Sequence, residues 1–309
     1  MKMKNQRTTY GETLVELGRK NKNIVVLEAD LSRSTMGALF GAEYPDRFFE
    51  MGIAEANMAA TAAGLSLAGK IPFMASFAVF ATGRCYDQIR SGICIPALNV
   101  KICGSSAGLS DFGDGSTHQT IEDIAIMRVL PNMQVFCPAD SSEAARIINY
   151  MEANSGPMYI RLNRMDLPEV SGDEPFAPGR IYTLKDGKDV AVFACGVMVS
   201  RALEAAERLE KEGISVKVVN APSIKPIDSA QVAEAAAGVK AVVTAEEHSA
   251  LGGLGGLICE IVSELASRKI VRVGIQDKFG SSAQDYETLL NAYGLNAAGI
   301  ADAVKASLK

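Results

Sequence analysis

The chain has 309 residues, of which 48% are hydrophobic and 22% charged, a balance typical of globular proteins and sufficient to bury the cores of two domains. Its formal net charge of −5 gives no reason to expect a nucleic acid or an anionic membrane as a partner. The six cysteines form no C-x-x-C pair and there are only two histidines, which argues against a zinc site.

The N-terminal segment and the overall hydropathy indicate where the protein works. The polar, basic start of the chain is not followed by the apolar stretch of a signal peptide. No run of about 18 strongly apolar residues predicts a membrane span. Cysteines in apolar runs, such as Cys94 between Ile93 and Ile95, are typical of reduced core residues. Together these features predict a cytoplasmic protein without a membrane partner.

The first half of the chain alternates helical and extended patterns. Tyr10, Leu14 and Leu17 recur at helical spacing, and residues 24–27 form a short buried-strand pattern. Strands are also expected at 48–51, 71–74, 100–103, 134–136 and 158–162, and helices at 54–67, 86–93, 121–129 and 143–151. This alternation predicts an α/β fold with a largely parallel sheet flanked by helices.

A change of texture divides the chain into two such units. Prolines and glycines interrupt the pattern at residues 169–188, which we interpret as a linker between a first domain at 1–168 and a second at 189–309. In the second domain, strands are expected at 190–194, 216–219, 241–243 and 271–274, and helices at 200–212, 257–266 and the C-terminus. No internal repeat of about 20 to 50 residues is evident.

One glycine-rich segment has a superficial likeness to a cofactor motif. Residues 252–256 read Gly-Gly-Leu-Gly-Gly and follow a predicted strand. Their spacing fits the dinucleotide-binding fingerprint poorly. We therefore interpret this segment as a tight turn that opens a packed helix.

Three segments of the first domain are specific when they are taken together. Residues 48–58 read Phe-Phe-Glu-Met-Gly-Ile-Ala-Glu-Ala-Asn-Met, residues 113–119 read Gly-Asp-Gly-Ser-Thr-His-Gln and lead into Leu-Pro-Asn-Met, and residues 159–164 read Tyr-Ile-Arg-Leu-Asn-Arg. In this order and at about this spacing, they resemble transketolase. The resemblance covers the whole chain but only the back part of a full-length transketolase. It implies a pyrimidine-binding domain followed by a transketolase C-terminal domain.

The resemblance implies a thiamine diphosphate enzyme that transfers a two-carbon ketol unit from a ketose phosphate to an aldose. The family's diphosphate-binding domain has no counterpart here, which implies a separate N-terminal partner subunit carrying Mg²⁺ or Ca²⁺ and an assembly of two copies of each chain. Gly113-Asp114-Gly115 resembles the start of the family's metal motif, but Asn132 is too near and Asn149 too far to complete it. No metal ligand is therefore expected in this chain. The second domain is expected to support dimer packing.

Glu55 matches the glutamate that, in this superfamily, hydrogen-bonds a ring nitrogen of the aminopyrimidine and so activates the cofactor. A carboxyl group in an apolar pocket can keep the proton that this role requires. Phe77 and Phe80 match two aromatic residues that cage the pyrimidine ring. A third family aromatic residue maps near Gly83, where Tyr86 or a partner residue could take its place. Three further residues are implied to contact the cofactor: Asp30, Leu31 and Ile53.

The sugar-binding residues of the family also have matches. Asp114 and His118 match residues that contact hydroxyl groups of the donor sugar, and a histidine suits proton exchange near neutral pH. Arg164 matches the arginine that grips the sugar phosphate, for which a guanidinium fork is well suited. Ser34 and Arg7 map near two further phosphate contacts.

Two positions depart from the family or lie outside its site. Ser105 and Ser106 stand where the family usually has another substrate-binding histidine. A serine can hydrogen-bond a hydroxyl group but cannot act as an acid near neutral pH, so the identity of the donor sugar stays open. His248, in Glu-Glu-His, is expected to be structural.

Other thiamine-dependent enzymes share the same two-domain plan. Glu-Glu-His at 246–248 with the glycines that follow indicates the beta chain of a 2-oxoacid dehydrogenase, and Tyr-Asp-Gln at 86–88 indicates a 1-deoxyxylulose-phosphate synthase. A scaffolding subunit that has lost turnover is the non-enzyme alternative. The 113–119 motif and Arg164 favour ketol transfer.

Overall fold

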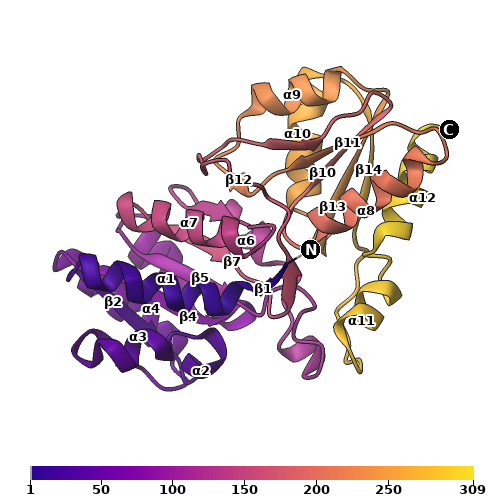
Figure 1. The fold of residues 1–309 in the computed structure, drawn as a ribbon. Coiled ribbons are helices and arrows are strands. Elements are labelled where there is room, and N and C mark those ends of the chain that lie inside the picture. The colour runs from indigo at the N-terminus through magenta and orange to yellow at the C-terminus, as the bar shows by residue number, and fades with distance from the viewer. Residues whose placement is uncertain (1) are drawn as a thin grey trace.

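A seven-stranded sheet forms the centre of the first half of the protein, in a computed structural model that describes residues 2–309 (Figure 1). The strand order is β12-β6-β7-β5-β4-β2-β3, and all neighbours are parallel except β12 and β6. The strands are β2 (Ile24–Glu28), β3 (Phe48–Glu50), β4 (Ile71–Phe77), β5 (Lys101–Ser105), β6 (Gln134–Phe136), β7 (Met158–Arg161) and β12 (Ser223–Lys225). The predicted, largely parallel sheet is confirmed.

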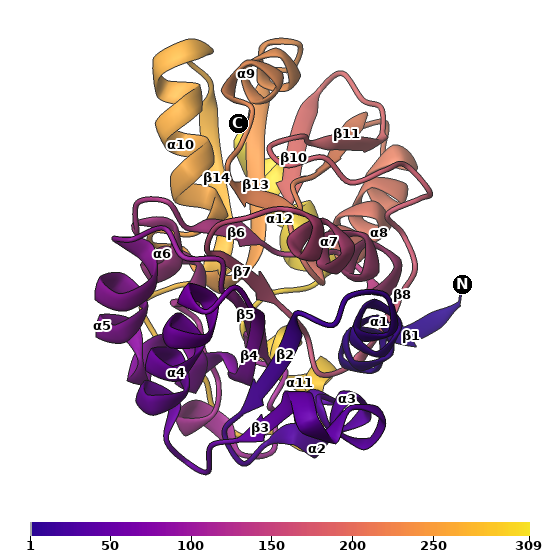
Figure 2. The ribbon, with the colours of Figure 1, turned by 90° about the vertical axis from the view of Figure 1, so that its left-hand side faces the viewer.

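Helices cover both faces of this sheet. They are α1 (Gln6–Lys20), α2 (Ser32–Thr35), α3 (Ala38–Glu43), α4 (Glu55–Leu67), α5 (Tyr86–Gln88), α6 (Asp123–Arg128) and α7 (Ser141–Ala153). Figure 2 shows α1 and α3 on one side of the strands and α4 and α5 on the other. Ile24 and Val26 of β2 share one core with α1 and α7, whereas Val25 and Leu27 share another with α4. A strand covered on both faces reads as a continuous apolar run, which explains the pattern at residues 24–27.

The chain between β4 and β5 differs from the single helix that was expected at residues 86–93. It forms a π-helical turn at Phe80–Arg84, the short α5, and a second π-helical stretch at Ile89–Cys94. Such turns widen the helix locally and are frequent at functional sites. The first of them follows closely on β4 and therefore sets the direction of Phe80 and Arg84.

A five-stranded sheet forms the second half, in the order β14-β13-β10-β11-β9, and only β9 is antiparallel to its neighbour. Its strands are β9 (Tyr182–Lys185), β10 (Val190–Ala194), β11 (Val216–Asn220), β13 (Ala241–Ser249) and β14 (Lys269–Ile275). Its helices are α8 (Met198–Glu210), α9 (Ser229–Ala237), α10 (Leu254–Leu265), α11 (Tyr286–Ala292) and α12 (Ala297–Ser307). This sheet confirms the second α/β unit that the sequence predicted.

Segments from one half complete the other. The strand β12 follows β11 of the second sheet but pairs with β6 at the edge of the first. One apolar core contains Met127 and Leu130 of the first half together with Phe193 and Ile258 of the second. Residues 169–188, expected to be an irregular linker, contain β9, which pairs with β11. The two sheets therefore rest against each other through a shared core.

The glycines at 252–256 open a helix, as predicted. Gly253 precedes α10, and the buried carboxylate of Glu246 accepts hydrogen bonds from Leu254 N at 2.7 Å and Gly255 N at 2.8 Å. A carboxylate of the protein thus satisfies the helix N-terminus that a dinucleotide phosphate would otherwise need. His248 is fully buried and its Nε2 accepts a hydrogen bond from Ala125 N at 3.3 Å. This contact gives His248 a structural role.

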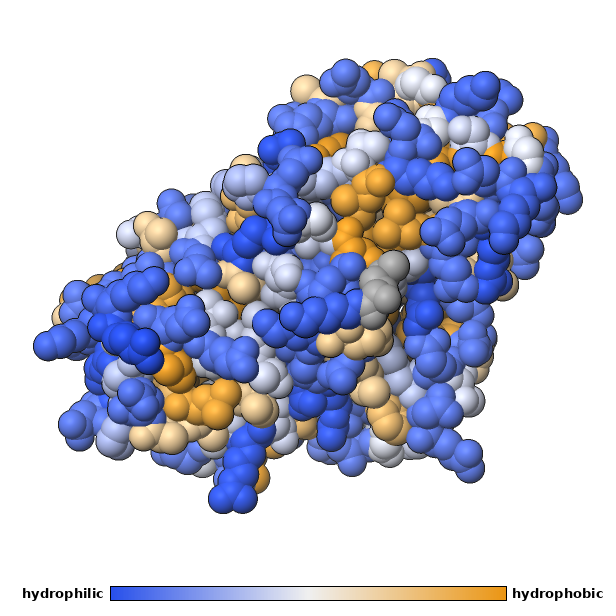
Figure 3. All heavy atoms as spheres, in the orientation of Figure 1, coloured by the Kyte–Doolittle hydropathy of each residue, from blue (hydrophilic) through white to orange (hydrophobic). Residues whose placement is uncertain are grey.

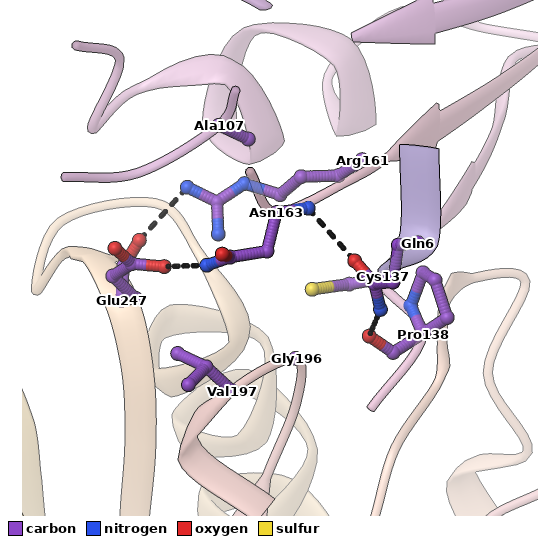
Figure 4. Close-up of a pocket in the computed structure, with 9 residues that line it drawn as sticks. All are labelled: Gln6, Ala107, Cys137, Pro138, Arg161, Asn163, Gly196, Val197 and Glu247. Atoms are coloured by element: carbon purple, nitrogen blue, oxygen red, sulfur yellow. Dashed lines mark hydrogen bonds between the residues drawn. The ribbon is translucent and has the colours of Figure 1, made fainter. Parts of the chain in front are cut away.

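A small cavity lined by both polar and apolar residues lies between the two halves (Figure 4). Gln6 Oε1 accepts a hydrogen bond from Asn163 N at 2.7 Å, and Gln6 Nε2 donates to Pro138 O at 2.9 Å. Across the cavity, Asn163 Nδ2 donates to Glu247 Oε2 at 3.3 Å, and Arg161 Nη2 donates to the backbone oxygen of Glu247 at 2.8 Å. Glu247 belongs to β13, so these bonds tie the second sheet to the end of β7.

Burial raises the pKa of Glu247 from its ordinary value of 4.5 to about 7. Between these two pH values the folded chain therefore keeps a proton on Glu247, whereas the unfolded chain has lost it. The free energy of unfolding contributed by Glu247 is present below about pH 4.5 and is lost as the pH rises through about 7. We expect wild type to lose stability relative to Glu247→Gln across this window, by on the order of 2 kcal/mol.

Urea unfolding at several pH values measures this difference. Glu264→Gln is the matched control, because Glu264 is exposed and its substitution should leave the pH dependence unchanged. A stability difference between wild type and Glu247→Gln that does not vary with pH would contradict the prediction.

Among the helices of residues 2–309, none combines the length and apolar character needed to cross a bilayer. The face drawn in Figure 3 is largely hydrophilic, with separate apolar patches.

Candidate active site

Most of the candidate site residues predicted from the sequence lie at the carboxyl ends of five neighbouring strands. Strands β7, β5, β4, β2 and β3 lie side by side in this order and run parallel. The carboxyl ends of parallel strands meet at one edge of a sheet, where open α/β proteins bind ligands. The candidate residues follow these strands directly: Arg164 after β7, Ser106 after β5, Phe77 and Phe80 at the end of β4, Asp30 and Leu31 after β2, and Ile53 and Glu55 after β3.

Glu55 is the buried carboxyl group of this edge. The chain bends at Gly52, whose φ is +66°, and Glu55 then begins α4 with a side chain that is only 5% exposed. An acidic side chain is favourable in the first turn of a helix. Its Oε1 accepts a hydrogen bond from Arg84 Nη1 at 2.8 Å.

An aromatic cluster lies beside Glu55. The rings of Phe77 and Phe80 are stacked with centroids 6.2 Å apart, and the ring of His118 meets both edge-on at 6.2 Å and 5.4 Å. The guanidinium of Arg84 lies 3.9 Å from the centre of the Phe80 ring. The chain therefore brings Glu55, the two predicted cage residues and His118 into one continuous set of contacts.

Arg84 is a site residue that sequence reasoning missed. For the third aromatic position, near Gly83, the sequence leaves open whether Tyr86 or a partner residue takes its place. Tyr86 instead packs against the apolar core, and Arg84 covers the Phe80 ring while it bonds Glu55. The only signal in the sequence was a cation next to Gly83, and the π-helical turn is what directs it inward.

Buried hydroxyl groups line the same edge. Ser76, Ser105 and Ser106 are all at most 1% exposed, and their Oγ atoms have no hydrogen-bond partner among residues 2–309. Ser106 also has a φ of +52°, a conformation that only a few per cent of residues other than glycine adopt. A buried hydroxyl without a partner is costly unless a ligand uses it. These hydroxyls are thus available to a bound molecule.

Two arginines converge at the other end of the edge. Asn5 caps α1 by accepting from Arg7 N, and its Nδ2 donates to Arg164 O at 2.9 Å, which brings the two arginines together. Arg7 Nη1 donates to Ser34 O at 2.8 Å. Burial and then the nearby charge of Arg164 lower the pKa of Arg7. Two close guanidinium groups repel, so an anion beside them would be stabilised.

Asp111 is a second residue that the sequence analysis missed. Its carboxylate, 2% exposed, bonds Arg164 Nη1 at 2.7 Å. Burial raises the pKa of Asp111, against the effect of Arg164, and the neighbouring Asp114 raises it further. Asp114 itself is exposed, and His118 is half-buried with Nδ1 2.9 Å from Thr117 Oγ1. The 111–119 loop therefore contacts both parts of the site: His118 packs against Phe80, and Asp111 bonds Arg164.

The remaining predicted cofactor residues lie around the rim. Asp30 is exposed and its backbone N donates to Glu50 Oε1 at 2.6 Å, while Ile53 is 73% exposed. Leu31 is half-buried and precedes α2. Burial raises the pKa of Glu28 well above its usual range, and its Oε1 accepts from Thr35 Oγ1 at 2.7 Å. Glu28 thereby supports α2, the helix that carries Ser34.

These features fit one side of an aminopyrimidine ring. A buried carboxyl group stands beside two phenylalanine rings and a histidine, and unpaired hydroxyls lie at the same edge. Within residues 2–309, no cluster of three or more His, Cys, Asp or Glu side chains is arranged to hold a metal ion.

Comparison with known proteins agrees with this geometry. The family model for the transketolase pyrimidine-binding domain matches residues 2–170, and that for the transketolase C-terminal domain matches residues 179–300. A putative transketolase C-terminal section of Methanocaldococcus jannaschii is 44% identical over 99% of this chain and 97% of its own length. A 6-deoxy-6-sulfo-D-fructose transketolase subunit of a Clostridium species is 40% identical over 94% of this chain and 90% of its own.

A solved structure gives the same result. It is described as a split-gene transketolase in an inactive beta4 tetramer, and it superimposes with a TM-score of 0.89 at 50% identity, covering 98% of both chains. Relatives at this identity and coverage share their ancestry along the whole of this sequence. The chain therefore belongs to the transketolase family, and its two halves are the pyrimidine-binding and C-terminal domains of that family.

Proposed function

We propose that this chain is the pyrimidine-binding subunit of a two-chain transketolase, which transfers a two-carbon ketol unit from a ketose phosphate to an aldose. The observation that supports the proposal most directly is the buried Glu55 beside Phe77, Phe80 and His118. Membership of the family implies the use of thiamine diphosphate, which supplies the carbanion chemistry when bound.

The residues of this chain would bind and orient the pyrimidine end of the cofactor. Glu55 would present a proton to a ring nitrogen, as a carboxyl group in an apolar pocket can. Phe77 and Phe80 would supply apolar surface and exclude water. Arg84 Nη1 lies 2.8 Å from Glu55 Oε1, so Arg84 would move aside or share the Glu55 side chain with the ring.

The donor sugar would lie between the aromatic cluster and the arginine pair. His118 and Asp114 would contact its hydroxyl groups, with His118 able to exchange a proton near neutral pH. Arg164, Arg7 and Ser34 would hold its terminal phosphate. One relative is named for a sulfonated ketose, and a sulfonate offers a guanidinium fork the same tetrahedral oxygen geometry. We propose that these residues bind a phosphate group, and the experiment below also tests a sulfonate.

The missing half of the cofactor site would come from a partner. Two relatives carry names that describe a C-terminal section and a split gene, which supports a separate N-terminal subunit that binds the diphosphate and its Mg²⁺ or Ca²⁺. We propose two copies of each chain in the active assembly. Calorimetry with thiamine diphosphate and Mg²⁺ should detect no tight binding to this chain alone.

The test is reconstitution with a chain that carries the family's diphosphate-binding domain. The pair should convert xylulose 5-phosphate and ribose 5-phosphate in a reaction that depends on thiamine diphosphate. The same assay with a sulfonated ketose separates the two anion classes. Turnover of pyruvate in place of the ketose would instead favour the 2-oxoacid dehydrogenase or deoxyxylulose-phosphate synthase alternative, and no turnover with any substrate would favour a scaffolding subunit.

Arg164→Lys is expected to raise KM for xylulose 5-phosphate on the order of tenfold, because it keeps the charge but loses the guanidinium fork. KM for a ketose without a terminal anion should change little. Steady-state kinetics of the reconstituted pair measure both values. Arg180→Lys, at a partly exposed ion pair far along the chain, is the control. An equal rise in KM for both donors would argue against phosphate binding by Arg164.

A further inference from the structure

A segment of the C-terminal domain lies directly on the loop that carries His118. We call residues 279–283, between β14 and α11, the strap. Ser281 O accepts a hydrogen bond from Gln119 Nε2 at 3.0 Å, and Ala283 N donates to Phe112 O at 2.9 Å. The strap therefore bonds both ends of the 111–119 loop, although more than 150 positions separate them in the sequence.

The strap and the loop lie so close that a side chain at either of two glycines would displace the group facing it. A Cβ added at Gly280 would lie 1.8 Å from Gln119 Oε1, and a Cβ added at Gly115 would lie 2.5 Å from Ser282 Oγ. Gly115 also has a φ of +77°, which side chains rarely adopt. Two glycines thus let the strap and the loop approach within van der Waals distance.

Gln119 connects the strap to the sugar-binding residues. It is 4% exposed, and its Nε2 also donates to Asp111 O at 3.2 Å. Asp111 in turn bonds Arg164 at 2.7 Å. His118 directly precedes Gln119 in the chain, and its ring packs against Phe80. A shift of Gln119 would therefore move groups at both ends of the proposed sugar site.

The strap is itself held by its own domain. Tyr293 Oη, just after α11, donates to Phe279 O at 2.8 Å. At the start of α11, Tyr286 Oη accepts from Asn163 Nδ2 at 2.7 Å, which ties the helix to the segment just before Arg164. A segment fixed near both ends can hold an otherwise exposed glycine-rich loop in one conformation. The entropy cost of ordering that loop then does not reduce the free energy of substrate binding.

We propose that the strap positions the 111–119 loop for donor binding, with Gln119 and Gly280 as positioning residues. The second domain thus has a part in the active site besides the dimer packing expected from the sequence. This inference rests on the proposed function for its kinetic consequence. Its structural consequence, ordering of the loop by the strap, does not depend on that function.

The variants Gly280→Ala, Gln119→Ala and the double variant test the proposal. A methyl group at Gly280 displaces the Gln119 amide and with it the bonds to Ser281 and Asp111. We expect KM for xylulose 5-phosphate to rise about tenfold in each single variant, with kcat within about threefold. The double variant should be no worse than Gln119→Ala, because the clash is gone. Gly238→Ala, where a Cβ meets no heavy atom of residues 2–309 within 4 Å, is the control.

Hydrogen exchange of the full chain gives a readout that needs no catalysis. Backbone amides of residues 113–119 should exchange faster in Gly280→Ala and Gln119→Ala than in wild type, whereas those of β13 should not. Unchanged loop exchange together with unchanged KM in both single variants would overturn the proposal, and so would additive effects in the double variant. Absence of ketol transfer in the wild-type pair would refute the proposed function, and the exchange result would still decide whether the strap orders the loop.

Discussion

Glu55→Gln is expected to lower kcat for ketol transfer by about 10²–10⁴-fold in the reconstituted pair, the usual contribution of a positioned acid or base. Glutamine keeps the size of the side chain and an oxygen that can accept from Arg84, but it has no acidic proton to present to the pyrimidine nitrogen. The loss should therefore appear in kcat, and KM for the ketose phosphate should change little.

The fold should tolerate this substitution. Arg84 is 49% exposed, so loss of its charge partner costs little stability in the surrounding water. Steady-state kinetics with circular dichroism and thermal unfolding separate a catalytic effect from a folding defect. Glu43→Gln, at an exposed position at the end of α3, is the matched control. Activity of Glu55→Gln within about threefold of wild type would remove Glu55 from the mechanism.

Asp123→Ala is expected to give a large loss of stability, about 3–5 kcal/mol, because it leaves a buried cation without its partner. Asp123 is fully buried and its Oδ2 accepts from Arg161 Nε at 2.8 Å and from Tyr159 Oη at 2.7 Å. Arg161 is only 5% exposed and cannot reach water without moving β7. Arg161 also lines the interdomain cavity, so loss of the pair should loosen the contact between the halves.

The urea midpoint measures this effect, and Asp302→Ala, at an exposed position on α12, provides the control. The double variant Asp123→Ala with Arg161→Met should recover part of the loss, because an apolar side chain replaces the stranded charge. If Asp123→Ala unfolds within about 1 kcal/mol of wild type, the ion pair is not a major source of stability.

Local patterns in the sequence were enough to predict the two α/β units. The apolar run at 24–27 predicted a strand covered on both faces, and the turn at 252–256 predicted the start of α10; both are confirmed. The motifs at 48–58, 113–119 and 159–164 together identified the family. The spacing of apolar residues and the preferences of turn residues act over a few positions, so strands and helix starts can be predicted without knowing any distant contact.

Which residues make up the site depends on contacts that a local sequence pattern does not predict. The sequence marked Glu55, Phe77 and Phe80 but not Arg84, since a π-helical turn directs that arginine inward. It marked Arg164 but not Asp111, whose partner lies 53 positions away.

By itself, then, the sequence determined the family, the two α/β units and the residues at the strand ends. Only the tertiary structure decided that β12 completes the first sheet and that the 279–283 strap lies on the 111–119 loop. The physical reason is the same in both cases. Each contact joins segments far apart in the chain, and which of them meet depends on how two whole domains pack, not on the preferences of either segment alone.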